Sequence, residues 1–475
     1  MILNTVGKMV FAEGLFLILP TLVSLIYREH CTVSFLITVA IALGIGAILI
    51  STAKPRSSVI YAKEGFIIVS ASWILFSLIG AFPFFFSGEI PSYVDAVFET
   101  VSGFTTTGAS ILTDVEAISR GLLFWRSFTH WIGGMGILVF VMAVIPNVSE
   151  RSIHILRAEV PGPTVGKLVP RIKDTAKILY LIYIVLTVIQ ILLLIGGGMP
   201  AFDSIVHAFG TAGTGGFGIK ADSVGGYSPY LQWVIAIFML LFGINFNVYY
   251  LCLIRRFKSA LKSTELWVYL AIIAGATGLI GITLYPHYQT LSDTARHAFF
   301  QVSSIITTTG YSTADFNLWT PFAKGILLIL MFVGACAGST GGGIKISRIV
   351  LIVKQIRKEI QRMLHPRSVK SLRFEGRPVE EQTLTGVSSY LGIYLLCFVV
   401  IFLIISLEPF GLESNFSAVA ACFNNIGPGF GSVGPLASYA TYSPLSKIVL
   451  SIAMLLGRLE IFPLIIFFSP TAWKK

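Results

Sequence analysis

The chain has 475 residues; 55% of them are hydrophobic and only 12% are charged, whereas a typical soluble domain carries about 25% charged residues. This composition excludes an ordinary soluble domain and indicates a polytopic membrane protein. The net charge of +11 does not indicate nucleic-acid binding, because the basic residues lie in loops between apolar stretches, where membrane orientation accounts for them.

Ten apolar stretches approach the length of about 20 residues that a helix needs to cross a bilayer. We expect membrane spans at 9–27, 35–53, 66–87, 120–146, 176–197, 229–254, 265–285, 320–364, 386–407 and 444–468, the eighth with a break. No small-residue cleavage site follows the first stretch, so we expect a retained span rather than a signal peptide. The five cysteines are far apart and show no CxxC or Cys/His spacing, which argues against a metal or disulfide framework.

Four shorter segments, too short to cross, lie between the later spans and end on related glycine sequences: 91–107, 201–213, 292–308 and 413–425. Thr105-Thr106-Thr107-Gly108 recurs letter for letter as Thr307-Thr308-Thr309-Gly310, within 15-residue stretches that share 8 identical positions. Two further segments match this sequence more weakly: Gly213-Thr214-Gly215-Gly216-Phe217 and Asn424-Asn425-Ile426-Gly427-Pro428-Gly429. A short half-helix followed by a polar glycine loop indicates a re-entrant loop, which is tolerated only where protein or a water-filled cavity covers it.

This internal repetition predicts the fold. We expect an all-α polytopic membrane protein with four pseudo-symmetric helix–pore-loop–helix repeats around a central pore, preceded by two extra helices. The expected units are an N-terminal helix pair (1–64), repeat 1 (65–150), repeat 2 (151–260), repeat 3 with a break in its second helix (261–365) and repeat 4 (366–475).

The positions of the basic residues predict the orientation. With the N-terminus inside, the inner segments are 1–8, 54–65, 147–177, 255–264, 345–381 and 469–475. They hold 26 of the 34 Lys and Arg residues, which satisfies the positive-inside rule. The same orientation places all four re-entrant loops on the outer side.

Threonine and glycine in four converging loops suit the coordination of a dehydrated monovalent cation. Backbone carbonyls and Thr hydroxyls replace the lost hydration shell, and glycine reaches the required backbone angles at low cost. Each half-helix also points its partially negative C-terminal end toward its loop. Acidic residues follow three loops, where they either enrich cations or, more commonly, cap the loop: Asp114, Asp222 and Asp315. Simple helix packing also favours small residues, but it does not explain repetition at one topological place.

The break in the eighth span is a glycine-rich stretch, 334–343. Each glycine in a helix costs about 1 kcal/mol relative to alanine, so we expect the chain to unwind here, beneath the loops. Ser339 and Thr340 would make it a polar plug that blocks or retracts. A phosphate-binding loop is not indicated, because Ile344 separates the last glycine from Lys345 and no soluble strand precedes it.

Two cations lie near this stretch. An arginine inside a span, such as Arg458, costs about 2.5–3.5 kcal/mol on insertion scales and usually marks function. Glu460 faces another side of the helix, so carbonyls of the glycine-rich stretch are the expected partners of Arg458; a structural tie within the bundle is the alternative. Lys345 is either a gate cation or an anchor that extends toward the membrane surface.

Five sequence motifs resemble those of the TrkH/KtrB/HKT superfamily of potassium transporters, with the TrkH family most similar. They are FETVSGFTTTGAS (98–110), LLFWRSFTHWIGGMG (122–136), GACAGSTGGGIKISR (334–348), NNIGPGFGSVGP (424–435) and GRLEIFP (457–463). The resemblance covers nearly the whole chain, and the ten spans with an extra N-terminal pair favour TrkH over the shorter KtrB.

The resemblance implies a function and its residues. Potassium would bind at a selectivity filter formed by Thr106, Thr107, Gly108, Gly213, Thr214, Gly215, Thr308, Thr309, Gly310, Asn425, Ile426 and Gly427. The intramembrane gate would comprise Gly338, Ser339, Thr340, Gly341, Gly342, Gly343, Lys345 and Arg458. The resemblance also implies K⁺ as the transported ion, no nucleotide on this chain, a cytosolic TrkA-like subunit that binds NAD(H) or ATP/ADP, and a homodimer. It places the chain in a bacterial inner membrane, with both termini cytoplasmic.

Two other functions stay open at this point. A cation-coupled (H⁺ or Na⁺) secondary carrier also uses repeats and broken helices, but it favours paired acids at the midplane, and only Glu13 and Glu460 are at hand. An intramembrane enzyme would need a catalytic motif, and no HExxH, GxSxG or paired Asp motif is present. The basic segment 345–381 fits either attraction to anionic lipid or a docking face for a regulatory subunit.

Overall fold

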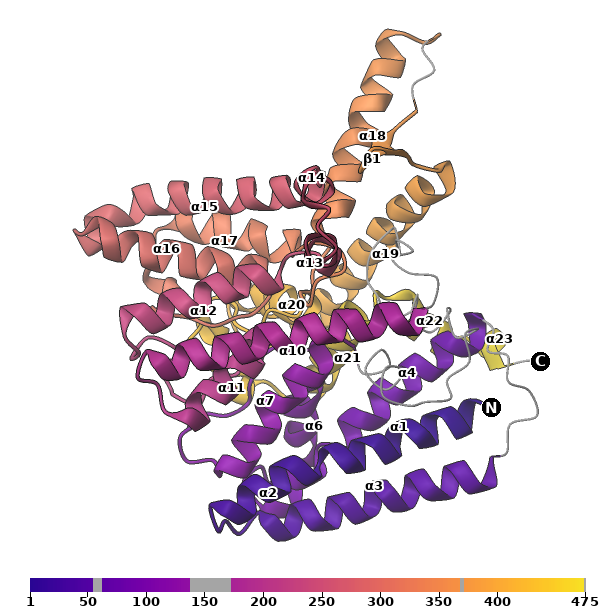
Figure 1. Ribbon diagram of the computed structural model, residues 1–475, viewed down its shortest axis with the longest axis vertical. Helices are drawn as coiled ribbons and strands as arrows, with labels where there is room; N and C mark the ends of the chain where they lie inside the picture. Colours follow the sequence, from indigo (N-terminus) through magenta and orange to yellow (C-terminus); the bar gives the residue numbers. More distant parts are fainter. Residues whose placement is uncertain (54–61, 137–171, 368–370, 474–475) are drawn as a thin grey trace.

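The computed structural model describes residues 1–53, 62–136, 172–367 and 371–473, and within them the regular secondary structure is helical apart from one short hairpin. The all-α prediction is therefore confirmed. Among these residues, six stretches are long and apolar enough to cross a membrane: Ile2–Ile26, Thr32–Thr52, Lys63–Ser87, Lys177–Gly196, Thr264–Tyr288 and Glu381–Ile405. The start of α1 (Ile2–Phe16) and α23 (Pro470–Trp473) lie at the same end of the bundle (Figure 1).

The N-terminal pair lies outside the repeats and packs on the first of them. α1 and α2 (Ile18–Ile26) form one span, which begins earlier than predicted, and α3 (Thr32–Thr52) returns beside it. Small residues bring the two backbones together, as is common between membrane helices. A Cβ built on Gly46 would lie 2.7 Å from the backbone nitrogen of Phe11.

The rest of the chain repeats one pattern four times: a long helix, a half-helix, a loop and a second helix. Repeat 1 contains α4 (Ala62–Ile79), α5 (Phe82–Ser87), half-helix α6 (Tyr93–Phe104) and α7 (Arg120–Gly134). Repeat 2 contains α10 (Ile172–Gly196), half-helix α11 (Ala201–Ala212), α12 (Pro229–Phe242), α13 (Phe246–Leu253) and α14 (Phe257–Leu261). Repeat 3 contains α15 (Thr264–Tyr288), half-helix α16 (Leu291–Ile306), α17 (Pro321–Val333) and α18 (Ile346–Leu364). Repeat 4 contains α19 (Glu381–Ile405), half-helix α20 (Leu412–Phe423), α21 (Pro444–Arg458), α22 (Phe462–Phe468) and α23. All four predicted half-helices are present.

Local sequence explains where these helices begin. Three of the second helices start with a Ser or Thr cap followed by proline at the first helical position: Ser228-Pro229, Thr320-Pro321 and Ser443-Pro444. Each half-helix carries an acidic residue in its first turn, where the helix dipole favours negative charge: Asp95, Asp203, Asp293 and Glu413.

The second helix of every repeat ends after 13 to 15 residues, too few to cross a membrane. The predicted break at 334–343 is confirmed. The continuous spans predicted at 229–254 and 444–468 are wrong: α12 and α13 meet at 88°, and Glu460 and Ile461 both have positive φ. α7 ends at Gly134, and the remainder of the predicted span 120–146, from residue 137, lies outside the described residues, as does most of the inner segment 147–177.

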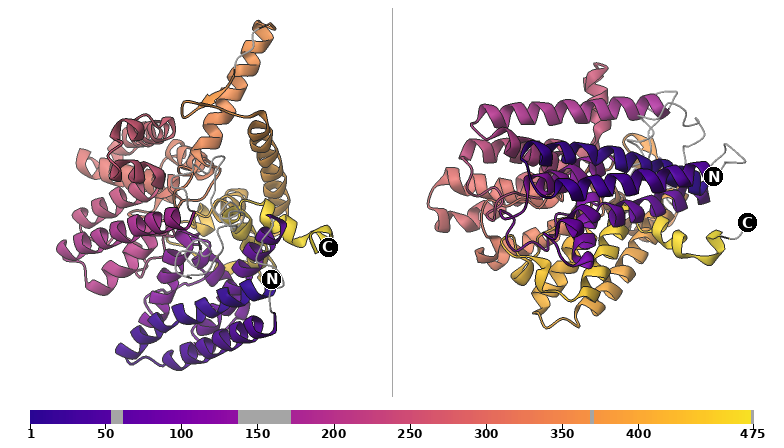
Figure 2. Two further views of the ribbon diagram at one scale, coloured as in Figure 1. Left: turned by 45° about the vertical axis from the view of Figure 1, so that its right-hand side comes forward. Right: turned by 90° about the horizontal axis from the view of Figure 1, so that it is seen from below.

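The repeats close into a ring. The second helix of each repeat packs against the half-helix of the next: α7 on α11, α12 on α16, α17 on α20, and α21 on α6 of repeat 1. In the left view of Figure 2 the colours accordingly pass around the bundle in chain order. The four loops that follow the half-helices therefore meet at the centre.

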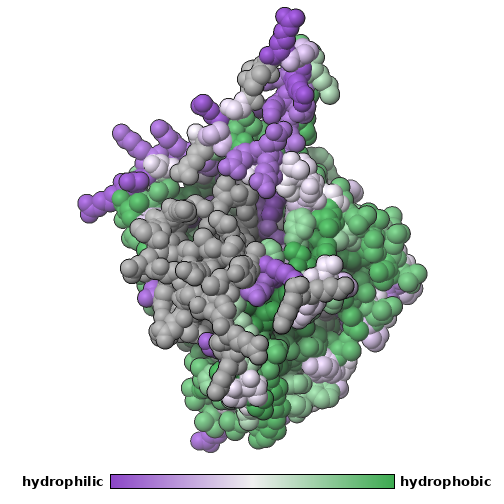
Figure 3. Space-filling view, turned by 90° about the vertical axis from the view of Figure 1, so that its right-hand side faces the viewer, coloured by the Kyte–Doolittle hydropathy of each residue, from purple (hydrophilic) through white to green (hydrophobic). Residues whose placement is uncertain are grey.

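One arm leaves the bundle (Figure 1). It consists of the far part of α18 and a hairpin of β1 (Arg373–Phe374) and β2 (Arg377–Pro378), which the sequence analysis did not predict. Glu375 and Gly376 both have positive φ, as a two-residue hairpin turn requires. Hydrophilic residues gather on this arm in Figure 3.

Candidate functional site

The four central loops share one backbone conformation. We number them loop 1 (Thr105–Gly108), loop 2 (Gly213–Gly216), loop 3 (Thr307–Gly310) and loop 4 (Asn424–Gly427). The second residue of each is left-handed, although none is glycine: Thr106, Thr214, Thr308 and Asn425 have φ between 53° and 58°. The fourth residue is a glycine with positive φ: Gly108, Gly216, Gly310 and Gly427. In each loop the second residue's amide donates to a carbonyl three residues back, which ends the half-helix with a left-handed cap.

The fourth residue of each loop touches the next loop around the ring. A Cβ built on Gly108 would lie 2.0 Å from the Gly215 carbonyl oxygen, and one on Gly216 would lie 1.9 Å from the Thr309 carbonyl oxygen. A Cβ on Gly310 would lie 2.1 Å from the Ile426 carbonyl oxygen, and one on Gly427 would lie 2.6 Å from the Thr107 carbonyl oxygen. Every distance is well inside van der Waals contact. Only glycine fits these places, and the contacts pass from loop 1 to loop 4 and back to loop 1.

This geometry corrects the alignment of loop 2. In the filter predicted from sequence Gly215 takes the place of Gly108 and Gly310, but the structurally equivalent residue is Gly216. Its amide donates to a carbonyl six residues back, as that of Gly310 does, at 3.4 Å in both. The equivalents of Thr106 and Thr107 are therefore Thr214 and Gly215, and Gly213 matches Thr105.

Gly215 stands where the other loops have a side chain, and the ring of His130 from α7 fills the vacated space. A Cβ on Gly215 would lie 2.2 to 2.4 Å from three His130 ring atoms. The ring is fully buried, and its two nitrogens bond the Gly103 carbonyl at 2.7 Å and the Phe217 amide at 3.3 Å. His130 thereby joins the half-helix of repeat 1 to loop 2.

This packing leads to a stability prediction. Gly215→Ala is expected to lower the apparent melting temperature of the purified protein, because the new methyl group overlaps the His130 ring. The same change in a His130→Ala background should cost much less, giving a coupling of about 1 kcal/mol or more, as for residues in contact. Thermal melts of the four proteins in one detergent measure this. Additive effects would contradict the packing.

A buried ion pair braces the outer ends of loops 1 and 2. Arg126 Nε donates to Glu99 Oε1 at 2.5 Å, and the same guanidinium donates to the Gly218 carbonyl at 2.9 Å. Glu99 also accepts from the Ile111 amide at 2.9 Å. Glu99, Arg126 and His130 thus act as scaffold residues. Asp114 and Asp315 cap their loops by accepting from backbone amides two residues ahead.

The first and third threonine hydroxyls of loops 1 and 3 bond within the scaffold. The first and third hydroxyls pair at 2.8 Å in both, Thr105 with Thr107 and Thr307 with Thr309. Asn425 of loop 4 donates to the Thr107 hydroxyl at 3.0 Å and so links loops 4 and 1. The first and third hydroxyls of each loop are therefore occupied, whereas the buried Thr106 hydroxyl has no hydrogen-bond partner among the described residues. This hydroxyl and the backbone carbonyls are the groups in the two loops most available to a cation.

The glycine-rich stretch after α17 (Gly334–Lys345) lies directly against loops 3 and 4; we call it the gating loop after the role that the resemblance implies for it. The Gly342 amide donates to the Thr308 hydroxyl at 2.7 Å. A Cβ on Gly341 would lie 2.8 Å from the Thr307 carbonyl, and one on Gly342 2.6 Å from the Asn424 carbonyl. The glycine-rich stretch therefore covers the first residues of loops 3 and 4, at the C-terminal ends of their half-helices.

The gating loop also bonds to the break between α12 and α13. Cys336 and Thr340 donate backbone amides to the carbonyls of Gly243 and Phe242, at 3.1 and 3.4 Å. In return, the Phe246 amide donates to the Gly338 carbonyl at 3.0 Å. Two broken helices thus satisfy each other's backbone groups, which buried chain requires.

Arg458 ends α21 at the gating loop. Its guanidinium donates to the Thr340 carbonyl at 2.9 Å, to the Gly134 carbonyl at 2.8 Å and to the Gly133 carbonyl. The predicted contact with a carbonyl of this loop is present. Arg458 therefore connects repeats 1, 3 and 4 around the loop.

The neighbouring cations have other partners. Lys345 is buried, and its ammonium donates to the Gly341 carbonyl within the loop, so it is not an anchor that extends to the membrane surface. Arg348 forms an ion pair with Glu460 at 2.5 Å and lies over the Tyr390 ring. Sequence analysis did not single out Arg348.

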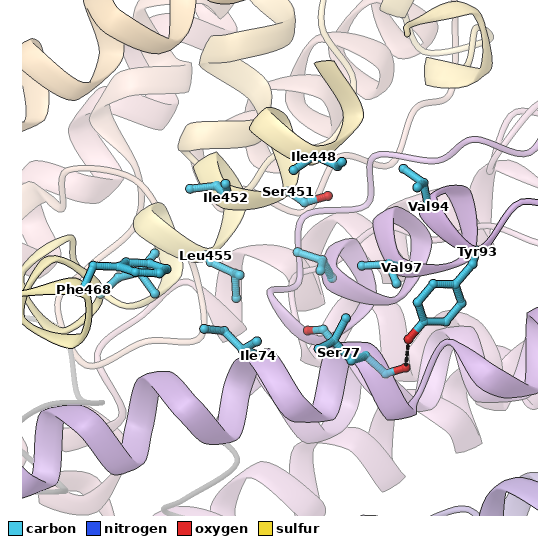
Figure 4. A pocket seen from close by; sticks show the side chains of 13 residues that line it. Ile74, Ser77, Tyr93, Val94, Val97, Ile448, Ser451, Ile452, Leu455 and Phe468 are labelled. Carbon is cyan, nitrogen blue, oxygen red and sulfur yellow. Dashed lines mark hydrogen bonds between the residues drawn. The ribbon is translucent and has the colours of Figure 1, made fainter. Parts of the chain in front are cut away.

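An apolar pocket of about 360 Å³ lies between α4, α6, α21 and α22 (Figure 4). Its few hydroxyls are bonded to backbone: Tyr93 to the Leu78 carbonyl, Ser77 to Trp73 and Ser451 to Lys447. With no free oxygen to offer a cation, this pocket is not an ion site.

Four pore-loop repeats with a covered centre define a multi-pass cation transporter. The family model for TrkH, described as cation transport protein, matches residues 32–475, and the chain belongs to this family. It is 39% identical to the Trk system potassium uptake protein TrkH of Salmonella typhimurium and 38% identical to that of Escherichia coli K12, over 100% of this chain and 99% of each relative. The crystal structure of the potassium transporter TrkH from Vibrio parahaemolyticus superposes with a TM-score of 0.88 at 33% identity, covering 100% of this chain and 99% of that one. The family is one of cation transport rather than an enzyme class.

Proposed function

We propose that this chain conducts K⁺ across the membrane through a filter made of loops 1 to 4. The observation that carries the proposal is the closed ring of four equivalent loops, each following a half-helix whose C-terminal end points at it. Partial negative charge at four helix ends, together with the backbone carbonyls of four converging loops, suits a dehydrated monovalent cation. Relatives over the whole chain are named potassium uptake proteins.

The proposed filter residues are those predicted from sequence, with loop 2 shifted by one: Thr106, Thr107, Gly108, Thr214, Gly215, Gly216, Thr308, Thr309, Gly310, Asn425, Ile426 and Gly427. The gating loop lies beneath them and keeps the pathway closed in this conformation. Conduction requires the loop to leave the Thr308 hydroxyl and the Arg458 guanidinium.

The secondary-carrier alternative needs paired acids, which Glu13 and Glu460 do not provide. Glu460 is paired with Arg348, while Glu13 lies on α1, which packs against α3 and α4 outside the ring. The two acids that the sequence offered for a coupling ion are therefore not a pair.

We also propose a partner and an orientation for this chain. The arm presents exposed arginines, such as Arg357 and Arg362, on the side where the basic segments predict cytoplasm. This surface suits a cytosolic TrkA-like regulatory subunit carrying NAD(H) or ATP/ADP. We further propose a homodimer in a bacterial inner membrane, with both termini cytoplasmic and no nucleotide on this chain. Tight binding of ATP or NADH to the purified chain would contradict the last point.

Reconstitution tests the function. Proteoliposomes containing the purified chain are expected to take up radioactive Rb⁺, competed by K⁺ and not by choline, down an imposed gradient. Single-channel recording with ion replacement then separates mechanisms, because unitary currents require a continuous pore. Rb⁺ uptake that depends on an H⁺ or Na⁺ gradient, without unitary currents, would favour the carrier.

A further inference from the structure

A buried carboxylate holds both ends of the gating loop. Glu265, in the first turn of α15, is only 4% exposed. Its Oε1 accepts from the Ala337 amide at 2.7 Å and from the Ser347 amide at 3.1 Å. Its Oε2 accepts from Asn245 Nδ2 at 3.5 Å, at the break between α12 and α13. One side chain thus contacts the start of the loop, the helix after it and the neighbouring broken helix.

These bonds favour the loop position seen in the structure. The Ser347 amide is one of the first amides of α18, which have no partner within their own helix, and the positive end of α18 attracts the carboxylate. Bonds from amides to a carboxylate are stronger than bonds between neutral groups. When the loop retracts, Ala337 leaves and a buried charged oxygen loses a donor, which costs free energy.

A second carboxylate, on the arm, bonds to the backbone of Glu265. Glu375, in the hairpin turn, accepts from the backbone amide of Glu265 at 3.1 Å and from the Ser263 hydroxyl at 3.2 Å. The hairpin is fixed to α18 by Lys354, which donates to the Arg373 carbonyl at 2.8 Å and lies 5.9 Å from the centre of the Phe374 ring. The hairpin and the gating loop therefore meet at the same residue.

We propose that Glu265 is the positioning residue that latches the gating loop closed, and that Glu375 on the hairpin holds this latch. The inference rests on the proposed function, in which the gating loop closes the pore. A force that lifts the hairpin from α15 withdraws the cap on Glu265 and weakens the latch. The arm and the gate are thus connected by two carboxylates, with no need for α18 to move as a rigid lever.

The test compares basal Rb⁺ uptake into proteoliposomes. Glu265→Gln keeps the shape of the side chain but removes its charge, and it is expected to raise basal uptake about five- to tenfold, with K⁺/Na⁺ discrimination unchanged. Glu375→Gln should raise it about two- to threefold, and the double variant should not exceed Glu265→Gln, because both act through one latch. Glu408→Gln is the matched control and should leave basal uptake unchanged. The Glu408 carboxylate also accepts from a backbone amide at a helix start, that of Ser443 at 3.0 Å, but it does so at the end of α21 that lies away from the gating loop.

Thiol labelling reports the loop without relying on flux. Cys336 lies in the gating loop and Cys422 in half-helix α20, and both are buried. In Glu265→Gln, a membrane-impermeant thiol reagent should modify Cys336 faster than in the wild type, while Cys422 stays protected. Mass spectrometry of the two peptides in one sample separates local opening of the loop from general loosening, in which both react.

The outcomes separate the two ideas. Wild-type flux and wild-type Cys336 labelling in Glu265→Gln would overturn the latch. If Glu265→Gln loosens the whole fold, Glu375→Gln decides, because the Glu375 carboxylate lies on an exposed turn. Raised Rb⁺ flux with faster Cys336 labelling in Glu375→Gln would support the latch. Wild-type flux and labelling in this variant would overturn it. Absence of Rb⁺ flux in every protein would refute the proposed function, and Cys336 labelling would still decide the latch.

Discussion

Gly310→Ser is expected to reduce the preference for K⁺ over Na⁺ at least about tenfold, a change that needs only about 1.4 kcal/mol of relative binding. A side chain here meets the Ile426 carbonyl oxygen, which would be 2.1 Å from its Cβ, and the Pro428 ring at 2.8 Å. The residue also has φ 87°, which L side chains adopt at a cost of about 1–2 kcal/mol. The carbonyl must move, so the spacing that discriminates between ions is lost at one point of the ring. Parallel uptake of radioactive Rb⁺ and Na⁺ into proteoliposomes measures the change.

The chain offers a matched control in the same repeat. Gly325 on α17 has open space where its Cβ would stand, so Gly325→Ser should leave both uptake rates unchanged. A Gly310→Ser protein that folds like the wild type and keeps its full K⁺/Na⁺ discrimination would refute the filter assignment. Because Gly216 is the loop 2 equivalent of Gly310, Gly216→Ser should also reduce the K⁺/Na⁺ preference. Its side chain would displace the Thr309 carbonyl.

Most of the architecture could be predicted because its signals are local. Apolar length gives the long helices, acids in the first turn and Ser-Pro or Thr-Pro pairs mark helix starts, and Thr-Thr-Thr-Gly marks loops 1 and 3. The breaks after Phe242 and Arg458 carry weaker local signals, which are the Asn245 cap of α13 and Pro463 in the first turn of α22. They depend on partners elsewhere in the chain: the gating loop bonds to the exposed carbonyls of α12, and Arg348 bonds to Glu460.

The register of loop 2 shows why part of the site could not be predicted. A sequence alignment cannot distinguish the three glycines Gly213, Gly215 and Gly216. In the structure, each of them excludes a side chain for a different reason. A Cβ on Gly213 would strike the His130 carbonyl, one on Gly215 the His130 ring, and one on Gly216 the Thr309 carbonyl. Only the last contact belongs to the fourfold pattern.

Glu265 was missed for a related reason. An acid in the first turn of a helix is an ordinary feature, because the helix dipole favours it there. Its role appears only when the fold brings Ala337 and Ser347, more than 70 positions away in sequence, to its oxygens. Arg458, by contrast, could be singled out because a cation inside a span is costly wherever its partners lie.

Arg458→Ala is expected to raise basal Rb⁺ uptake about tenfold or more, because bonds from a charged donor contribute about 1.5–3 kcal/mol each. The guanidinium connects Thr340 in the gating loop to the carbonyls of Gly133 and Gly134 below loop 1. Without it, the loop keeps its bonds to Thr308 and Glu265 but loses its tie to repeats 1 and 4. Arg458→Lys should give an intermediate rise, since an ammonium cannot reproduce the planar fork that bridges several acceptors.

The comparison needs a second cation on the same helix. Lys447 is also buried on α21 and is paired with Asp95 at 2.6 Å, far along the helix from the gating loop. Lys447→Ala therefore removes a buried charge without touching the loop, and its basal uptake should stay at the wild-type level. Shortening Gly338–Gly343 should raise flux as Arg458→Ala does, because both remove the obstruction beneath the filter. Normal basal uptake in a well-folded Arg458→Ala protein would show that Arg458 ties the bundle together and does not hold the gate.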